Sequence, residues 1–514
     1  MARIKTFKAG STYDFANYYD ASNDAIAQAT TTQFGLTSGT ARLQITGTGF
    51  VYRSTGPVAG TVTALTLTDN GTQILSIDQL GLSLAQLYKL LGDPAAFSAF
   101  LFGGNDTFAG TATADYVTGF GGADSLVGGA GDDVLSGDAG NDYLRGDAGA
   151  DTLRGGTGND TVSGGDGADQ LYGDAGDDRL YGGADSDVLA GGSGNDRLVG
   201  DLGNDTLYGS AGNDSLTAGD GNDVLYGASD PLGNETGGNM LDGGLGNDTI
   251  YIGGARDTVY GGVGDDRVFS DELFTDAKVT VYGGDGNDSI HVGGIAYGEG
   301  GSDTLLGWRG HDLLDGGAGN DWLSGIDYSN MAAGTTVEDT LSGGIGDDTL
   351  IGYNNDLLYG GAGADKLTGS AFAYGEDGND TIIASVDENF SIPAGGILAG
   401  GAGDDVISGA LDGFTVDVGT GKDTVIAGVA SFDILNFGAG DLLDLSAIDA
   451  DPNVAGNQAF TWIGGQTFSQ KAGELRFDTA SHALSGDLDG DGYAEFTLTL
   501  TDTAAVNPGT SLKL

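Results

Sequence analysis

The fold is decided by stretches such as Gly128–Ser136 (GGAGDDVLS) and Gly155–Ser163 (GGTGNDTVS). Each is nine residues long, with Gly at the first, second and fourth positions, Asp at the sixth and an apolar residue at the eighth. From residue 101 to residue 226 the chain divides into fourteen such nonapeptides without a gap. A fixed period of this kind is the signature of a repeat architecture, so the repeat governs the fold prediction.

Two positions of the repeat never vary in kind over this stretch. The eighth residue is apolar in all fourteen nonapeptides, and the sixth is always aspartate. These sixth-position residues are Asp106, Asp115, Asp124, Asp133, Asp142, Asp151, Asp160, Asp169, Asp178, Asp187, Asp196, Asp205, Asp214 and Asp223. Chance does not maintain two columns over fourteen repeats, so both indicate a structural or chemical requirement.

The pattern resembles the G-G-x-G-x-D-x-U-x repeat of the RTX family, which forms a calcium-binding parallel β-roll. The resemblance covers roughly residues 101 to 426 and implies calcium as the ligand of the repeats. After residue 226 the repeats are interrupted, and insertions near 227–242, 270–282, 325–342 and 384–399 are expected to loop out, leaving open one stack or several. The aspartates of these later repeats are Asp248, Asp257, Asp266, Asp288, Asp303, Asp312, Asp321, Asp348, Asp365, Asp380, Asp405 and Asp423.

Each position of the repeat has an expected role. Glycines at the first, second and fourth positions permit left-handed backbone and close approach of carbonyl groups. The last three residues are expected to form a short strand whose apolar eighth residue points inward. Two nonapeptides then complete one coil, and equivalent positions stack at about 4.8 Å. The predicted fold class is all-β, a parallel β-roll.

Stacking also brings the aspartates together, which predicts a need for cations. Two carboxylates about 4.8 Å apart repel by roughly 3.5 kcal/mol at an effective dielectric constant near 20. Summed over a column, this exceeds the small net stability of a folded domain, so the bare roll is expected to be unfolded. Carboxylate and carbonyl oxygens without thiol or imidazole select calcium, and magnesium fits such a cage poorly. The alternative is a metal-free solenoid in which the aspartates only form turns.

Composition limits the possible partners and the compartment. The 514 residues include 75 acidic and 19 basic side chains, a net charge of −56, which argues against nucleic acid and anionic membranes as partners. There is no cysteine, so disulfides and thiolate metal sites are excluded. No apolar run is long enough for a transmembrane segment, and the N-terminus lacks the apolar core of a signal peptide. We expect an extracellular protein that is exported without an N-terminal signal peptide and that could be retained at the cell surface.

The two ends of the chain lack the nonapeptide. Residues 1–100 are expected to form a small β-rich domain, with alternating strands at Arg42–Tyr52 and Thr61–Leu67 and a helix from Ser83 to Leu91. The uninterrupted roll at 101–226 and the interrupted roll at 227–427 follow, and residues 428–514 are expected to form a C-terminal β cap.

The C-terminal region resembles that of serralysin-type proteases over about 75 residues, from Phe432–Asp449 to Gly486–Phe496. This resemblance implies a cap on the roll and export by a type I secretion apparatus. Within it, Asp487, Asp489 and Asp491 resemble the start of an EF-hand loop, but the twelfth position is Leu498 and not Glu, which favours a turn between two strands.

No catalytic constellation is visible in the sequence. The three histidines, His291, His311 and His482, cannot form H-E-x-x-H, and no G-x-S-x-G elbow occurs. We therefore expect a non-enzymatic structural protein of a surface layer, matrix or adhesion system, which could also assemble with itself or bind cell-surface polysaccharide. The alternatives are a polysaccharide-binding or polysaccharide-modifying protein, or a secreted hydrolase or toxin. Tyr208 and Tyr226 are expected to stack on one outer face, as a cross-strand ladder more readily than as a sugar platform.

Overall fold

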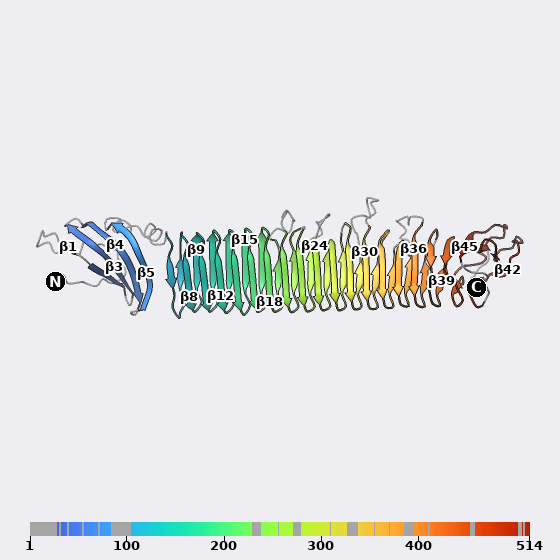
Figure 1. Ribbon diagram of the computed structural model, residues 1–514, viewed down its shortest axis with the longest axis horizontal. Helices are drawn as coiled ribbons and strands as arrows, with labels where there is room; N and C mark the ends of the chain where they lie inside the picture. Colours follow the sequence, from blue (N-terminus) through green and yellow to red (C-terminus); the bar gives the residue numbers. More distant parts are fainter. Residues whose placement is uncertain are drawn as a thin grey trace. The chain divides into compact units, whose positions relative to one another are not determined.

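In the computed structural model the chain falls into two compact units, Met1–Ser229 and Asp230–Leu514, and each is described by itself. Figure 1 labels the strands along the chain. The described residues are 28–29, 32–38, 41–53, 56–69, 72–83, 104–228, 238–254, 256–270, 279–308, 310–325, 338–353, 355–369, 371–384, 395–409, 412–452, 458–501, 506 and 509–514.

An antiparallel sheet forms the N-terminal part of the first unit. Its strands are β1 (Gln28–Ala29), β2 (Thr32–Ser38), β3 (Ala41–Arg53), β4 (Gly56–Asp69) and β5 (Thr72–Ser83). Strand β3 pairs with β1, β2 and β4, and β4 pairs with β5. Both predicted strands fall within β3 and β4, so the expected β-rich character is confirmed. The predicted helix starts at Ser83, which ends β5, and its remaining residues lie outside the described ones.

The repeats of the first unit form a parallel β-roll, here called the first roll. Its strands alternate between two sheets, even-numbered strands in one and odd-numbered strands in the other. The even strands are β6 (Thr107–Ala109), β8 (Ser125–Ala130), β10 (Tyr143–Ala148), β12 (Thr161–Asp166), β14 (Arg179–Ala184), β16 (Arg197–Leu202) and β18 (Ser215–Asp220). The odd strands are β7 (Tyr116–Thr118), β9 (Val134–Ala139), β11 (Thr152–Thr157), β13 (Gln170–Ala175), β15 (Val188–Ser193), β17 (Thr206–Ala211) and β19 (Val224–Tyr226).

The register confirms that two nonapeptides make one coil. Leu144 of β10 pairs in parallel with Leu126 of β8 and with Val162 of β12, each eighteen residues away. The strands are longer than predicted, however. Most span six residues, because pairing continues past the ninth position into the first three residues of the next repeat. A first-position Gly in extended backbone prolongs the strand, and the turn is confined to the fourth to sixth positions.

The core lies between the two sheets. Eighth-position side chains from Leu126 to Leu225 are no more than 1 % exposed. Strand residues alternate between buried and partly exposed positions, which places the first and eighth positions inside. One apolar side chain per repeat therefore builds a continuous core along the roll.

The second unit contains a second parallel β-roll, here called the second roll. Its even strands are β20 (Met240–Leu245), β22 (Thr258–Val263), β24 (Val279–Asp285), β26 (Gly294–Gly300), β28 (Leu313–Ala318), β30 (Thr340–Ile345), β32 (Leu357–Ala362), β34 (Phe372–Asp377), β36 (Ile397–Ala402), β38 (Thr415–Asp417) and β40 (Phe432–Leu435). Its odd strands are β21 (Thr249–Ile252), β23 (Arg267–Ser270), β25 (Ser289–Val292), β27 (Thr304–Gly307), β29 (Trp322–Ser324), β31 (Thr349–Ile351), β33 (Lys366–Thr368), β35 (Thr381–Ala384), β37 (Val406–Gly409), β39 (Thr424–Ala427) and β41 (Leu442–Asp444).

Parallel pairing in the second roll continues across three of the predicted insertions. Strand β22 pairs with β24, β28 with β30, and β34 with β36, although long chain intervals separate the coils. These insertions therefore leave the sheets of the second roll continuous. Most of their residues lie outside the described part of the chain.

The C-terminal region adds a mixed sheet and a last strand to the second roll. Strands β42 (Thr461–Gly464), β43 (Glu474–Asp478), β44 (Ala483–Asp487) and β45 (Phe496–Leu500) pair in sequence, and β45 pairs in parallel with β40. The short strand β46 (Leu512–Lys513) pairs in parallel with β41. Both sheets of the second roll thus end against C-terminal strands, in agreement with the predicted β cap.

Candidate metal sites along the turns

The sixth-position aspartates form hydrogen-bonded ladders along the edges of both rolls. We call the row of turns that leads into even-numbered strands the even edge, and the row that leads into odd-numbered strands the odd edge. In each ladder the backbone N–H of one aspartate donates to Oδ1 of the aspartate one coil further on, for example Asp142 to Asp160 at 2.7 Å. All of the aspartates predicted from the repeat except Asp257 lie in these ladders, and Oδ1 of Asp257 accepts the backbone N–H of Asn239 at 2.7 Å. All but Asp106 and Asp115 are buried, with at most 4 % of their surface exposed.

The second carboxylate oxygen is what makes these ladders candidate metal sites. In the regular turns Oδ2 is buried and has no hydrogen-bond partner. This holds for Asp106, Asp124, Asp133, Asp142, Asp151, Asp160, Asp169, Asp178, Asp187, Asp196, Asp205, Asp266, Asp288, Asp303, Asp321, Asp348, Asp365, Asp380, Asp405 and Asp423. A buried carboxylate oxygen without a partner is costly, so a row of them indicates a missing positive ligand.

The first-position glycine leaves space beside this oxygen. A Cβ atom on Gly164 would lie 2.1 Å from Oδ2 of Asp169 and 2.7 Å from the carbonyl oxygen of Gly182 in the next coil. The space is thus lined by a carboxylate oxygen and a backbone carbonyl of adjacent coils. This glycine was expected to permit both left-handed backbone and close approach of carbonyl groups, but Gly164 does not have a positive φ, whereas Gly165 and Gly167 do. Close approach of oxygen atoms, and not backbone conformation, requires the first glycine.

Burial shifts the acidity of the ladders. Desolvation raises the pKa of Asp160, Asp169 and Asp187 to about 7 from the usual 3.8, and hydrogen bonds from backbone N–H groups oppose the shift. Repulsion from neighbouring aspartates adds to the rise but is a smaller cause than burial. From the sequence we considered only mutual repulsion, part of which is offset by backbone N–H groups between successive carboxylates. The principal cost of the bare ladder is the burial of charge.

A second ladder, which the sequence analysis missed, runs beside the first. The fifth-position side chain accepts a hydrogen bond from the backbone N–H of the following coil, as when Asn159 N–H donates to Oδ1 of Asn141 at 2.9 Å. In the second roll Asp265 N–H donates in the same way to Asn247, at 3.0 Å. The sequence signal for this second ladder was the presence of Asn, Asp or Ser at most of the fifth positions. The two ladders have opposite directions, so each regular turn is tied to both neighbours.

The repeat pattern also missed three aspartates of the second roll. Asp312 N–H donates to Asp339 at 2.8 Å, Asp339 N–H to Asp356 at 2.9 Å, and Asp423 N–H to Asp441 at 3.1 Å. Each of the three precedes a short apolar strand, which is the signal that could have identified them. Their turns depart from G-G-x-G, and for this reason a search for the full nonapeptide passes over them.

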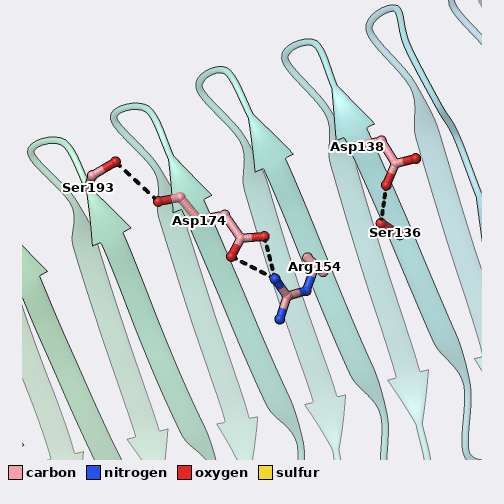
Figure 2. Close-up of polar contacts among 5 residues, drawn as sticks. All are labelled: Ser136, Asp138, Arg154, Asp174 and Ser193. Atoms are coloured by element: carbon pink, nitrogen blue, oxygen red, sulfur yellow. Dashed lines mark hydrogen bonds and ion pairs between the residues drawn. The ribbon is translucent and has the colours of Figure 1, made fainter.

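The outer face of the first roll carries polar side-chain pairs (Figure 2). Arg154 on β11 donates to both carboxylate oxygens of Asp174 on β13, at 2.8 and 2.9 Å. Ser136 Oγ donates to Oδ1 of Asp138 at 2.7 Å. Asp138 and Asp174 occupy the second position with φ of 69° and 74°, where Asp is tolerated better than most residues. Exposed pairs of this kind contribute little stability, about 0–1 kcal/mol.

Outward-facing tyrosines stack along both rolls. Tyr208 and Tyr226 stack with ring centroids 4.8 Å apart, as predicted. In the second roll Tyr282 stacks between Tyr260 and Tyr297, at 5.1 and 5.2 Å. The rings are nearly parallel, so each covers a face of its neighbour and a sugar would find mostly ring edges. The geometry favours the cross-strand ladder.

The loop that resembles an EF-hand start is a turn between β44 and β45, as expected. Carboxylate oxygens of Asp487, Asp489, Asp491 and Glu495 all lie within 4.8 Å of one another. Glu495 was missed because EF-hand spacing places the last ligand at the twelfth position, not the ninth. Backbone N–H groups of Gly490 and Gly492 already donate to Asp487, at 2.7 and 3.0 Å, and we assign no ion to this loop.

The donor set of the regular turns fits calcium. Each offers a buried carboxylate oxygen and backbone carbonyls, hard ligands that calcium prefers, and the sequence contains no thiol. Calcium would be held by Oδ2 of the ladder aspartates and would supply the positive charge that compensates their burial.

Among the described residues, no helix is long and apolar enough to cross a membrane.

The comparison with curated proteins found no match. The comparison with protein families supports calcium as the ligand of the regular turns. The RTX calcium-binding nonapeptide repeat matches residues 102–135, 127–162, 136–171, 163–198, 199–230, 235–269, 279–294, 295–323, 324–354, 333–367, 352–373, 372–390 and 396–412, which together cover more than half of the sequence. The chain therefore belongs to the family of the RTX calcium-binding nonapeptide repeat.

Proposed function

We propose that this protein is a secreted, extracellular structural component whose rolls fold when calcium fills their edges. One observation carries the proposal: the ladder carboxylates present a row of buried oxygens without hydrogen-bond partners, and a bound cation would compensate their charge. Calcium outside the cell is abundant enough to occupy many sites of modest affinity. Folding would then follow export.

We also propose that the protein has no enzymatic activity and acts through its shape and charge. A surface layer, a matrix or an adhesion system would use a long acidic roll that calcium makes rigid. The surplus of acidic side chains, 75 against 19 basic ones, supports assembly in which calcium bridges neighbouring molecules.

The C-terminal region supports a proposal on export. Its resemblance to serralysin-type proteases suggests a type I secretion apparatus that reads the C-terminus. In the folded chain Leu512 is 1 % exposed and β46 pairs with β41. A signal held in a strand is poorly accessible, so export of the calcium-free chain followed by folding outside is consistent with this arrangement.

The experiment is a calcium titration of the purified full chain, followed by circular dichroism and light scattering, with magnesium as the control. A cooperative gain of β signal with calcium alone supports the proposal. Ordered assemblies at the same calcium concentration support the surface-layer or matrix role, whereas a compact monomer counts against self-assembly. A chain that is fully folded in chelator contradicts calcium-driven folding.

A further inference from the structure

We propose that the second roll takes up its calcium along the odd edge, and that the even-edge aspartates Asp257 and Asp356 bind none. This inference rests on the proposed calcium function and adds where the ions lie. It follows from the different ways in which the two edges satisfy their buried oxygens.

The odd edge of the second roll is an unbroken ladder. Each step from Asp248 to Asp441 is an N–H donation to Oδ1 of the next aspartate, between 2.7 and 3.1 Å. Most of these aspartates have a buried Oδ2 without a partner, as in the first roll. The odd edge therefore repeats the candidate metal geometry from Asp266 to Asp423, whereas Oδ2 of the terminal Asp441 accepts the N–H of Gly438 at 2.6 Å.

The even edge has lost most of its carboxylates. From the register, its equivalent positions are Asn239, Asp257, Val279, Gly294, Asp312, Asp339, Asp356, Ala371, Gly396, Phe414 and Phe432. Val279 and Ala371 are completely buried, and Phe414 and Phe432 are 3 and 4 % exposed. Apolar side chains thus fill positions that hold carboxylates elsewhere, and they offer no ligand.

Two of the remaining even-edge aspartates are satisfied by their own turns. Gly254 N–H donates to Oδ2 of Asp257 at 2.9 Å, and Tyr353 N–H donates to Oδ2 of Asp356 at 2.6 Å. In the regular turns this oxygen faces the first-position glycine and has no donor. An N–H group brings the positive end of its dipole to the oxygen, which opposes a cation there. In these two turns the protein's own N–H groups satisfy the buried carboxylate oxygen.

The positions of the long chain intervals also indicate that the even edge of the second roll lacks cations. They occur between β23 and β24, β29 and β30, and β35 and β36, and all three lead from an odd strand into an even one. A turn that shares a cation with its neighbours must keep its ligand geometry, whereas a turn without one can accept insertions. The pair Asp312–Asp339 keeps a carboxylate in two successive turns of the even edge, although one of these intervals leads into the turn of Asp339, so the experiment includes it.

The test counts calcium bound to the full chain after metal removal and reconstitution, by equilibrium dialysis and elemental analysis. Asp365→Asn and Asp321→Asn on the odd edge should each lose about one or two ions, because each aspartate contacts two neighbouring coils. Their calcium midpoints should rise about twofold or more. Asp356→Asn and Asp257→Asn, the matched even-edge variants, should bind as many ions as the wild type at the same midpoint. Asp339→Asn shows whether the Asp312–Asp339 pair holds an ion.

The outcomes separate the two proposals. A wild-type chain that binds no calcium overturns the proposed function. Wild-type binding together with equal loss of ions in Asp356→Asn and Asp365→Asn overturns the edge assignment alone. Circular dichroism at saturating calcium on the same samples identifies a variant that fails to fold, and the second odd-edge or even-edge variant then decides.

Discussion

The first roll carries aspartate ladders on both edges, whereas the second carries an unbroken ladder on its odd edge only. Both have parallel sheets and an apolar column inside. What differs is how the turns compensate their buried oxygens. The first roll has carboxylates without donors on both sides, and the even edge of the second has apolar side chains and N–H donors. In the same fold, a turn can therefore have its buried carboxylate compensated by a bound cation, or it can do without a cation because it carries N–H donors or an apolar side chain.

The largest expected effect is a difference in calcium demand between the rolls. During calcium titration, hydrogen exchange measured by mass spectrometry should show protection of β21–β39 at lower calcium than protection of β8–β19. Most coils of the first roll have two candidate sites, and most coils of the second have one. Since every site filled at tenfold its Kd stabilises by about 1.4 kcal/mol, the first roll depends more steeply on calcium. Equal midpoints, or earlier protection of the first roll, would contradict the comparison.

The metal-free chain should gain β structure as the pH falls. Burial raises the pKa of Asp160 and Asp187 in the first roll, and of Asp303 and Asp365 in the second, to about 7 from 3.8. The folded state therefore holds protons that the unfolded chain releases. Its stability from this source is fully present below about pH 4 and is lost as the pH rises through 7.

Circular dichroism of dialysed, metal-free protein between pH 7.5 and 5 checks this prediction. In the presence of calcium the dependence should reverse, because protons compete with the ion for the same carboxylates and acidification lowers the apparent calcium affinity. A metal-free chain whose β signal is independent of pH over this range would show that the ladders do not limit folding.

Much of this comparison between the two rolls could be predicted from the sequence, but the features that depend on turn geometry could not. The period of nine, the sixth-position aspartates and the eighth-position core give the parallel roll, because each position has one dominant physical requirement. Asp356 and Asp441 were missed because their turns depart from the glycine pattern, although their carboxylates join the ladders. The donors to Asp257 and Asp356 come from backbone N–H groups, and these depend on turn geometry that side-chain identity does not reveal.

A carboxylate introduced on the even edge should sharpen the contrast. Ala371 is completely buried and follows Asp356 in the register of that edge. Ala371→Asp should destabilise the second roll by about 3 kcal/mol, since it buries a charge without a partner. The loss should remain in saturating calcium. Ala371→Asn separates the effect of charge from that of size. Thermal unfolding of both variants, with and without calcium, is the measurement, and full rescue of Ala371→Asp by calcium would show that this edge accepts ions.

The smallest expected effect lies where the odd ladder of the second roll ends and a protein cation takes part. Lys513 Nζ on β46 lies 2.7 Å from Oδ2 of Asp444 on β41. Burial alone would raise the pKa of Asp444, but hydrogen bonds from Lys513 and Ser446 outweigh it and lower the pKa. The ion pair therefore stabilises at neutral pH and is lost as acid protonates Asp444. Because the Lys513 side chain is 58 % exposed, Lys513→Met should cost only about 0.5 kcal/mol. This loss of stability should be the same at every calcium concentration that keeps the second roll folded, as measured by thermal unfolding. In this respect Lys513→Met should differ from substitutions of the ladder aspartates. A cost that grew as calcium fell would mean that the C-terminal strand and the cation row stabilise the odd edge together.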